Sequence, residues 1–199
     1  MSNAIAMVDA VFDVSGELLP ADYPYILWQA LVARAPELAV DDTVGLLPLR
    51  TAVTEGGVLL PKRAKLTLRL PQCLFAYAQA LSGLQLEVAG HALQLGQLRQ
   101  RQIQPYPTLH AHLVVADADE VGFLSDVAVL LERLEVEGKL ICGMRNALRC
   151  ADRTIQGYSL VIHDLKPEAS LRLQYAGLGA DRNYGCGVFV PYKAITDLD

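Results

Sequence analysis

The 199 residues are enough for one large domain or two small ones. Hydrophobic residues make up 52% and charged residues 20%, which indicates a substantial core and excludes a disordered chain. The formal net charge of −5 counts against a nucleic-acid-binding protein unless basic residues gather locally. No apolar run approaches the roughly 20 residues of a membrane span, and no signal-peptide pattern is present, so we expect no membrane partner.

The four cysteines lie far apart and form no CxxC pair; they are Cys73, Cys142, Cys150 and Cys186. This spacing favours reduced thiols in a cytoplasmic protein over disulfides. It also counts against a zinc site, so we expect no metal.

The first half of the sequence alternates between strand-like and helix-like patterns. Strands are predicted at 5–14, 44–53, 58–60, 65–70, 84–88 and 92–95. The clearest is 65–70, where leucines alternate with polar residues, as in a strand with two different faces. One helix is predicted to begin after Asp22 as its N-cap, and another to run from Pro71 to Leu81. The order β-α-β-β-α-β is that of a ferredoxin-like domain.

The second half repeats this order, after a strand at 98–103 and the segment Pro105-Tyr106-Pro107. Strands are predicted at 109–115, 139–148, 154–163 and 185–191, and helices at 119–134 and 167–175. We therefore predict an α+β fold of two tandem ferredoxin-like (RRM-like) domains, residues 1–105 and 106–199.

Basic residues gather locally although the chain as a whole is acidic. They are Lys62, Arg63, Lys65 and Arg69 in the first half, Arg99 and Arg101 on one face of a strand, Arg145, Arg149 and Arg153 around the second-half hairpin, and Arg182 and Lys193 near the end. Acidic residues are concentrated around the helix 119–134. This pattern predicts a basic surface that binds a polyanion with an affinity that falls as salt rises. The alternative is that the charges are scattered and merely solvated.

The most distinctive segment is GLGADRNYGCG, residues 177–187, between the last predicted helix and the last predicted strand. Its glycines, Gly177, Gly179, Gly185 and Gly187, bracket a polar insert that carries Arg182. Glycine allows close backbone approach, and successive N–H groups in such a loop can face an anion such as phosphate. A helix C-cap at Gly177 or Gly179, followed by a bulged strand start, would explain the same glycines without a ligand.

This segment resembles the glycine-rich loop that closes CRISPR-associated repeat-processing endoribonucleases of the RAMP superfamily. Six further stretches are similar to the MYXAN-type branch of that family: VDAVFD (8–13), LPAD (19–22), LTLRLP (66–71), LICG (140–143), GYSL (157–160) and SLRLQ (170–174). The resemblance covers nearly the whole chain in consistent order, and the glycine loop is its most specific part.

The resemblance implies tandem ferredoxin-like domains that bind the repeat hairpin of a CRISPR precursor transcript and cut it once per repeat, without metal or cofactor. It also implies that the protein can keep the product hairpin and join other subunits of an effector complex. The implied RNA-binding residues are Lys65, Arg145, Arg149, Arg153, Gly177, Gly179, Arg182, Gly185 and Gly187. Tyr158 and Tyr184 are candidates to stack on RNA bases.

The implied reaction is attack of a ribose 2′-OH on the adjacent phosphate, which needs a general base, a general acid and a cation. Histidine suits the base, and MYXAN-type relatives resemble Ala-Asp-His at the first helix. This chain has Tyr23 there, and its first histidine is His91. The catalytic candidates are therefore Tyr23 and Tyr25, with Lys62 as the cation; a tyrosine with a pKa near 10 would need nearby cations to act as a base.

The remaining histidines and the Tyr23 substitution leave other interpretations open. His110 and His112 share a strand face, and we interpret them as structural because no third metal ligand is evident nearby. The tyrosine in place of histidine favours, as one alternative, a catalytically weak or inactive RNA-binding subunit. A generic ferredoxin-like small-ligand protein with a purely structural glycine loop is the other.

Overall fold

The computed structural model describes residues 6–192, and the chain divides into two compact units. Residues up to Gln102, together with 149–153 and 182–185, form the first unit, and the other described residues form the second. Each unit has a hydrophobic core of its own. Ile5 and Lys193, which the sequence placed in a strand and in a basic group, lie outside the described residues. The predicted domain boundary between residues 105 and 106 stays a prediction.

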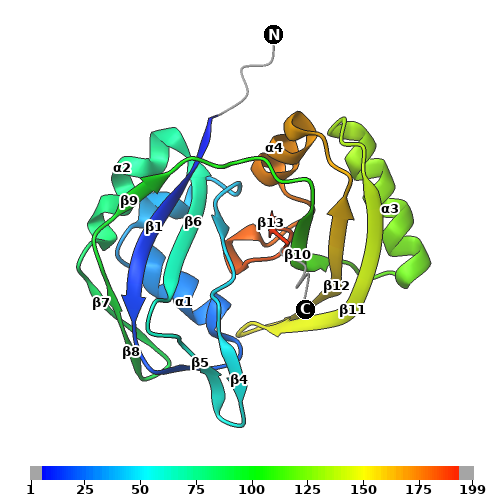
Figure 1. The fold of residues 1–199 in the computed structure, drawn as a ribbon. Helices are drawn as coiled ribbons and strands as arrows, with labels where there is room; N and C mark the ends of the chain where they lie inside the picture. Colours follow the sequence, from blue (N-terminus) through cyan, green and yellow to red (C-terminus); the bar gives the residue numbers. More distant parts are fainter. Residues whose placement is uncertain (1–5, 193–199) are drawn as a thin grey trace, which may run out of the picture. The chain divides into compact units, whose positions relative to one another are not determined.

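The first unit contains two small sheets and short helices (Figure 1). Its elements are β1 (Met7–Ser15), β2 (Leu18–Leu19), α1 (Tyr23–Val32), η1 (Pro36–Ala39), β3 (Gly45–Leu46), β4 (Ala52–Thr54), β5 (Gly57–Leu59), β6 (Lys65–Pro71), η2 (Gln72–Leu74), α2 (Phe75–Ala78), η3 (Gln79–Leu81), β7 (Gln85–Val88), β8 (His91–Leu95), β9 (Arg99–Arg101) and η4 (Arg182–Tyr184). The main sheet has the order β3-β6-β1-β8-β7, with β9 also paired to β1. Strands β2, β5 and β4 form a separate three-stranded sheet.

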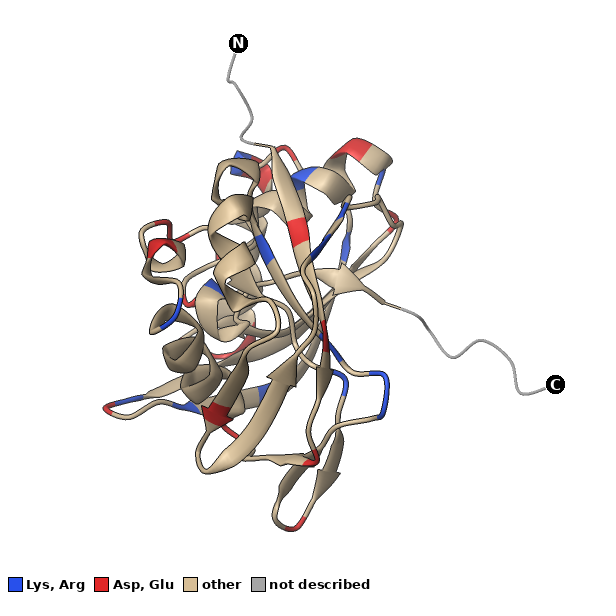
Figure 2. Ribbon diagram, turned by 90° about the vertical axis from the view of Figure 1, so that its left-hand side faces the viewer, with Lys and Arg blue, Asp and Glu red and all other residues tan. Residues whose placement is uncertain are grey.

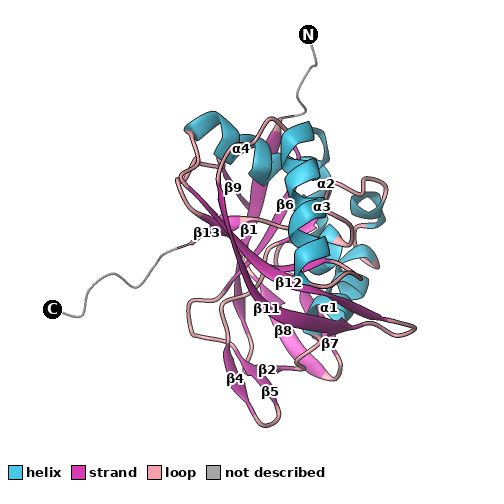
Figure 3. Ribbon diagram, turned by 90° about the vertical axis from the view of Figure 1, so that its right-hand side faces the viewer, coloured by secondary structure: helices cyan, strands magenta, loops and turns pink. Residues whose placement is uncertain are grey.

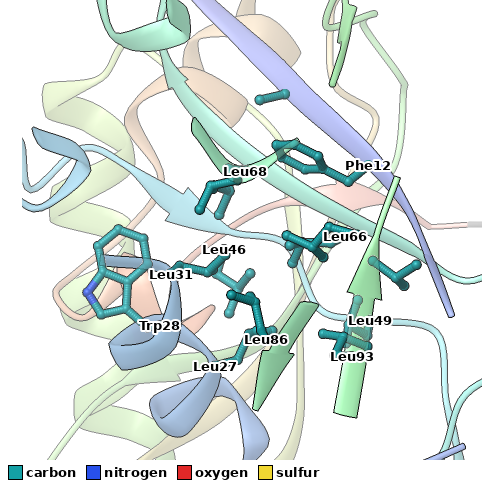
Figure 4. Packing of buried hydrophobic residues seen from close by; sticks show 14 of the residues in the cluster. Phe12, Leu27, Trp28, Leu31, Leu46, Leu49, Leu66, Leu68, Leu86 and Leu93 are labelled. Carbon is teal, nitrogen blue, oxygen red and sulfur yellow. The ribbon is translucent and has the colours of Figure 1, made fainter. Parts of the chain in front are cut away.

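The core of the first unit lies between its main sheet and α1. Leu27, Trp28 and Leu31 recur at helical spacing and are buried on one side of α1. They join Leu66 and Leu68 of β6 in one apolar cluster (Figure 4). The alternating leucines of β6 therefore face the core, as the period-two pattern predicts.

The second unit has β10 (Leu109–Val115), α3 (Glu120–Arg133), β11 (Lys139–Arg149), β12 (Thr154–His163), α4 (Pro167–Ala176) and β13 (Val190–Pro191) (Figure 3). Its strand order is β11-β12-β10-β13. Helices α3 and α4 share one apolar cluster with the sheet, so they cover the same face of it. The carboxylate of Asp119 accepts a hydrogen bond from the backbone N of Gly122 at 2.9 Å and caps α3.

The predicted α+β fold of two ferredoxin-like units is confirmed. In both main sheets the first strand lies between the third and the fourth of the β-α-β-β-α-β order, with the second strand outside the third. In the first unit these four strands are β1, β3, β6 and β8, and in the second they are β10, β11, β12 and β13. Among the described residues no helix is both long enough and apolar enough to cross a membrane.

Three sequence-based elements are wrong in detail. The predicted strand 44–53 is broken, because β3 ends at Leu46 and β4 begins at Ala52. Pro71 ends β6 with an extended backbone (ψ 139°) and is the N-cap of η2, so the predicted helix 71–81 begins one residue later and is divided into η2, α2 and η3. The predicted strand 185–191 shrinks to Val190–Pro191, since the positive φ of Gly185 and Gly187 is incompatible with a strand. Asp22 holds the N-cap position of α1, but its side chain makes no capping hydrogen bond.

Candidate functional site

Tyr23, the first residue of α1, is buried in the first unit. Its side chain is only 7% exposed, and its hydroxyl oxygen accepts a hydrogen bond from the backbone N of Leu49 at 2.9 Å. Burial raises the pKa of the Tyr23 phenol, and the hydrogen bond from Leu49 opposes this only in part. A general base needs the opposite shift, toward neutrality. The burial therefore favours a structural role, and the catalytic role of Tyr23 stays a prediction.

Tyr25 and Lys62 lie in different surroundings from Tyr23. The half-buried ring of Tyr25 packs edge-on against Tyr184, with ring centroids 5.3 Å apart and planes at 62°. Lys62 is exposed in the turn between β5 and β6. The predicted catalytic residues therefore do not gather at one point: Tyr23 contacts Leu49, Tyr25 contacts Tyr184, and Lys62 stands on a turn.

Arg182 is buried in the first unit and not displayed on an open polar loop, as the sequence suggested. It begins η4 and is 5% exposed. Burial, and then the charge of Arg69, lower its pKa to about 10, while Asp41 and Asp42 act in the other direction. The guanidinium is still cationic at neutral pH. Its contact with RNA stays a prediction.

Backbone N–H groups of the stretch 177–187 already donate hydrogen bonds within the protein. These donors and their acceptor oxygens are Gly177 to Leu173, Leu178 to Gly187, Gly185 to Arg182, Cys186 to Asp181 and Gly187 to Leu113. The predicted anion-binding arrangement of N–H groups is therefore wrong at these positions. Gly177 ends α4 with φ 64°, so the alternative interpretation as a helix cap is confirmed there.

Close backbone packing explains why this stretch needs glycine. Gly179, Gly185 and Gly187 all have positive φ (76°, 86° and 63°), a region that favours glycine. A Cβ at Gly187 would overlap the carbonyl oxygen of Leu178, and one at Gly185 would lie 3.2 Å from that of Leu46. Glycine here lets the chain pack against itself, whether or not RNA also approaches.

An ion-pair network crosses the face of the first sheet that points away from its core. The Asp9 carboxylate accepts hydrogen bonds from Arg69 Nε at 2.9 Å and Nη2 at 3.2 Å, and from Arg101 Nη2 at 3.0 Å. The side chains of Asp9 and Arg69 are 3% and 2% exposed, whereas that of Arg101 is 52% exposed. Arg69 is therefore a buried, paired residue and does not belong to an open basic cluster.

The second half of the network is exposed. Asp13 accepts a hydrogen bond from Arg99 at 2.7 Å, and Lys65 Nζ lies 3.9 Å from the same carboxylate. Pairing of both β9 arginines with β1 carboxylates confirms that Arg99 and Arg101 share a face. Because Asp9 and Asp13 lie among the basic side chains, the predicted segregation of charge does not hold on this sheet. Figure 2 shows the positions of Lys and Arg in blue and those of Asp and Glu in red, interspersed along the ribbon.

In the second unit, the predicted stacking residue Tyr158 is already stacked. Its ring is 8% exposed and lies on Phe123, with centroids 5.0 Å apart and an interplanar angle of 27°. The guanidinium carbon of Arg145 lies 5.5 Å from the Tyr158 centroid, and Arg145 Nη2 donates to Gln156 Oε1 at 3.1 Å. Arg145 is exposed and held in place, so it is better placed than Tyr158 to meet a ligand.

Arg149 and Arg153 flank the turn between β11 and β12, and both are exposed. The backbone N of Cys150 donates to the carbonyl oxygen of Arg153 at 2.8 Å and closes this turn. The turn thus displays two cations to solvent, as the sequence predicts.

Sequence reasoning missed a β-bulge in β10 beside His110 and His112. The bulge falls between Ala111 and Val114, where β10 loses register with β12. The sequence signal is a break in the alternation of core-facing residues: Leu109 and Ala111 are two positions apart, but the next core residue, Val114, is three positions farther on.

Comparison with known proteins gives consistent matches. A family model described as "Cas6 Crispr" matches residues 8–194. The CRISPR-associated endonuclease Cas6 of Myxococcus xanthus (strain DK1622) is 34% identical over 191 residues, 95% of this chain and 83% of that protein. A Cas6-related protein from Pyrococcus furiosus has a similar structure, with a TM-score of 0.69, 12% identity and coverage of 93% of this chain and 98% of that one. So does a RAMP protein described as binding different RNA substrates, with a TM-score of 0.69, 11% identity and coverage of 92% and 98%.

Proposed function

The chain belongs to the Cas6 family, and from that premise we propose that it is an endoribonuclease that cuts CRISPR precursor RNA within the repeat. The observation that carries the proposal is 34% identity, over 95% of this chain, to a protein named as a CRISPR-associated endonuclease. In finer detail, it binds the repeat hairpin and makes one metal-independent cut per repeat. The cut leaves a 2′,3′-cyclic phosphate and a 5′-OH, and a guide RNA is the product.

The exposed cations of the β11–β12 hairpin support RNA binding. Arg145 is held by Gln156 and Tyr158, and Arg149 and Arg153 stand at the turn. Arginine suits phosphate because its planar guanidinium donates several hydrogen bonds at once. In this proposal the phosphate backbone of the RNA hairpin lies against these arginines, and Lys65 stays a separate predicted RNA contact.

The test is cleavage of a 5′-labelled RNA of one complete CRISPR repeat from the genome that encodes this chain, with EDTA present. A single cut ending in a cyclic phosphate supports the proposal. The matched control RNA carries a 2′-deoxy nucleotide 5′ of the cut, which removes the attacking hydroxyl and should abolish cleavage but not binding. Multiple cuts, or a cut in the deoxy RNA, would contradict the mechanism.

Single substitutions then test the predicted catalytic residues. Tyr23→Phe, Tyr25→Phe and Lys62→Ala are each compared with wild type at saturating enzyme, so that binding defects do not lower the rate. Because the Tyr23 hydroxyl is buried on Leu49, we expect Tyr23→Phe to lower stability more than rate. A large loss of rate with unchanged stability would instead support Tyr23 as catalytic.

A second candidate function is a repeat-RNA-binding subunit that does not cut. The observation that favours it is Tyr23, buried with a raised pKa at the position where the family resemblance implies a histidine. Tight, salt-sensitive binding of the same repeat without any cut would favour this candidate over the nuclease.

A further inference from the structure

The bulge in β10 places two residues opposite a single residue of β12. Ala111 pairs with Leu160 and Val114 pairs with Tyr158, so His112 and Leu113 together face Ser159. Bulges are frequent next to active sites because they redirect a side chain. Here the bulge lies directly beside a pair of histidines.

Two hydrogen bonds hold the bulge from opposite sides. Asn146 Nδ2 of β11 donates to the carbonyl oxygen of His112 at 2.8 Å, and the backbone N of Gly187 donates to that of Leu113 at 2.7 Å. Both carbonyls that the bulge frees from the β-ladder are thus satisfied. The glycine stretch therefore fixes the backbone that carries His112.

Both imidazoles stand on the face of this sheet that the helices leave uncovered. Leu109 and Ala111 point into the core under α3 and α4, so the alternate positions His110 and His112 point away from it. His110 is half-buried and its ring centroid lies 5.7 Å from that of Tyr192, whereas His112 is exposed. The two Cα atoms are separated by roughly 6–7 Å along the strand.

We propose that His110 and His112 are the general base and the general acid of the RNA cut, taking the place of the histidine that α1 lacks. This assignment rests on the proposed endoribonuclease function. His110 removes the proton of the ribose 2′-OH, and the 2′-oxygen attacks phosphorus. The P–O5′ bond breaks, and protonated His112 gives its proton to the departing 5′-oxygen, which leaves a cyclic phosphate and a 5′-OH.

The surroundings of His110 shift its pKa in the direction that keeps a general base unprotonated. Burial, and then the charge of His112, lower the pKa of His110, so His110 is neutral near pH 7. Its cross-strand neighbours on this face are Val161 of β12 and Val190 of β13, both uncharged. Farther along β12, His163 is paired with Asp164, whose Oδ1 lies 3.2 Å from its Nδ1, and Asp164 is also paired with Lys139.

The experiment measures single-turnover cleavage of the same repeat RNA by wild type, His110→Gln and His112→Gln, with His91→Gln as the matched control. His91 lies in the first unit at the start of β8. We expect each of the first two variants to lose roughly 10²–10⁴-fold in rate with repeat binding preserved, and His91→Gln to cut like wild type. Circular dichroism and thermal melting confirm that each variant is folded.

The pH dependence of the rate separates a catalytic role from a structural one. Loss of a general base removes the fall in rate on the acidic side, and loss of a general acid removes the fall on the basic side. We therefore expect His110→Gln to abolish the acidic limb and His112→Gln to abolish the basic limb. Uniform scaling of an unchanged profile would overturn the assignment.

Other outcomes separate this inference from the proposed function. If wild type cuts and both variants cut at the same rate, the histidine assignment is wrong and the nuclease stands. If wild type binds the repeat but never cuts it, both fail together and the non-cutting subunit remains.

Discussion

Replacing Asp9 by alanine would remove the carboxylate that is paired with the buried guanidinium of Arg69. Asp9 accepts two hydrogen bonds from Arg69 and one from Arg101, and both Asp9 and Arg69 are nearly inaccessible to solvent. Removing one partner of a buried ion pair costs about 3–5 kcal/mol, because the remaining charge has lost its water and its counter-ion. That is a large share of the roughly 5–15 kcal/mol that stabilises a typical domain.

The assay is the free energy of unfolding from urea titration, with Asp13→Ala as the matched control. Asp13 is the other carboxylate of the same network, but it and Arg99 are 59% and 54% exposed. An exposed pair contributes only about 0–1 kcal/mol, since water and salt screen it. We therefore expect Asp9→Ala to unfold at far lower urea than wild type, and Asp13→Ala to unfold near the wild-type midpoint.

A double variant separates the charge from the packing. Asp9→Leu combined with Arg69→Met replaces both charged side chains of the pair by apolar ones of similar size. The double variant should therefore recover most of the stability that Asp9→Ala loses. Equal losses for Asp9→Ala and Asp13→Ala, within about 0.5 kcal/mol, would refute the reasoning that burial decides the cost.

Three further predictions follow from other parts of the molecule. Gly187→Ala should lower the melting temperature far more than Gly90→Ala. Both glycines have positive φ, which costs alanine about 1–2 kcal/mol. Of the two, only Gly187 would place the new Cβ so that it overlaps a carbonyl oxygen, that of Leu178. Because folding lowers the pKa of His110, the unfolded chain binds the proton more readily than the folded protein does. Stability should therefore fall as the pH drops from about 6.5 through the pKa of His110 in the folded protein. In thermal melts run from about pH 8 to about pH 5, His110→Gln should reduce this loss of stability. Arg149→Ala should weaken repeat binding and lower the slope of log affinity against log salt by about one, and an unchanged slope would exclude a phosphate contact there.

Much of the fold could be predicted because hydrophobic periodicity is a local property of the sequence. Strands β10 and β12 begin and end at the predicted residues, and α3 and α4 differ by a residue at their ends. The strand predicted at 185–191 was wrong because the glycines there act through their surroundings, and at Pro71 the helical segment begins one residue later than predicted. Backbone preference alone could not tell a strand end from a helix start at Pro71, since φ near −65° suits both.

The candidate site could be predicted only in part. Arg145, Arg149 and Arg153 are exposed, as expected of cations on a hairpin. Tyr23 and Arg182 are buried, and no local pattern indicates this, because their surroundings include residues far along the chain such as Leu49 and Asp41. The bulge beside His112 was likewise hidden, since a bulge is a relation between two strands and not a property of one.

By itself the sequence determined the α+β class, the repeated order of elements and a resemblance to CRISPR repeat-processing endoribonucleases. Tertiary structure alone decided which polar residues are enclosed and which are free to meet a ligand. Arg69 and Lys65 lie on the same strand face, yet one is buried on Asp9 and the other stands in solvent near Asp13. The physical reason is that the cost of a charge depends on its distance from water and from its counter-ion, and folding sets both distances.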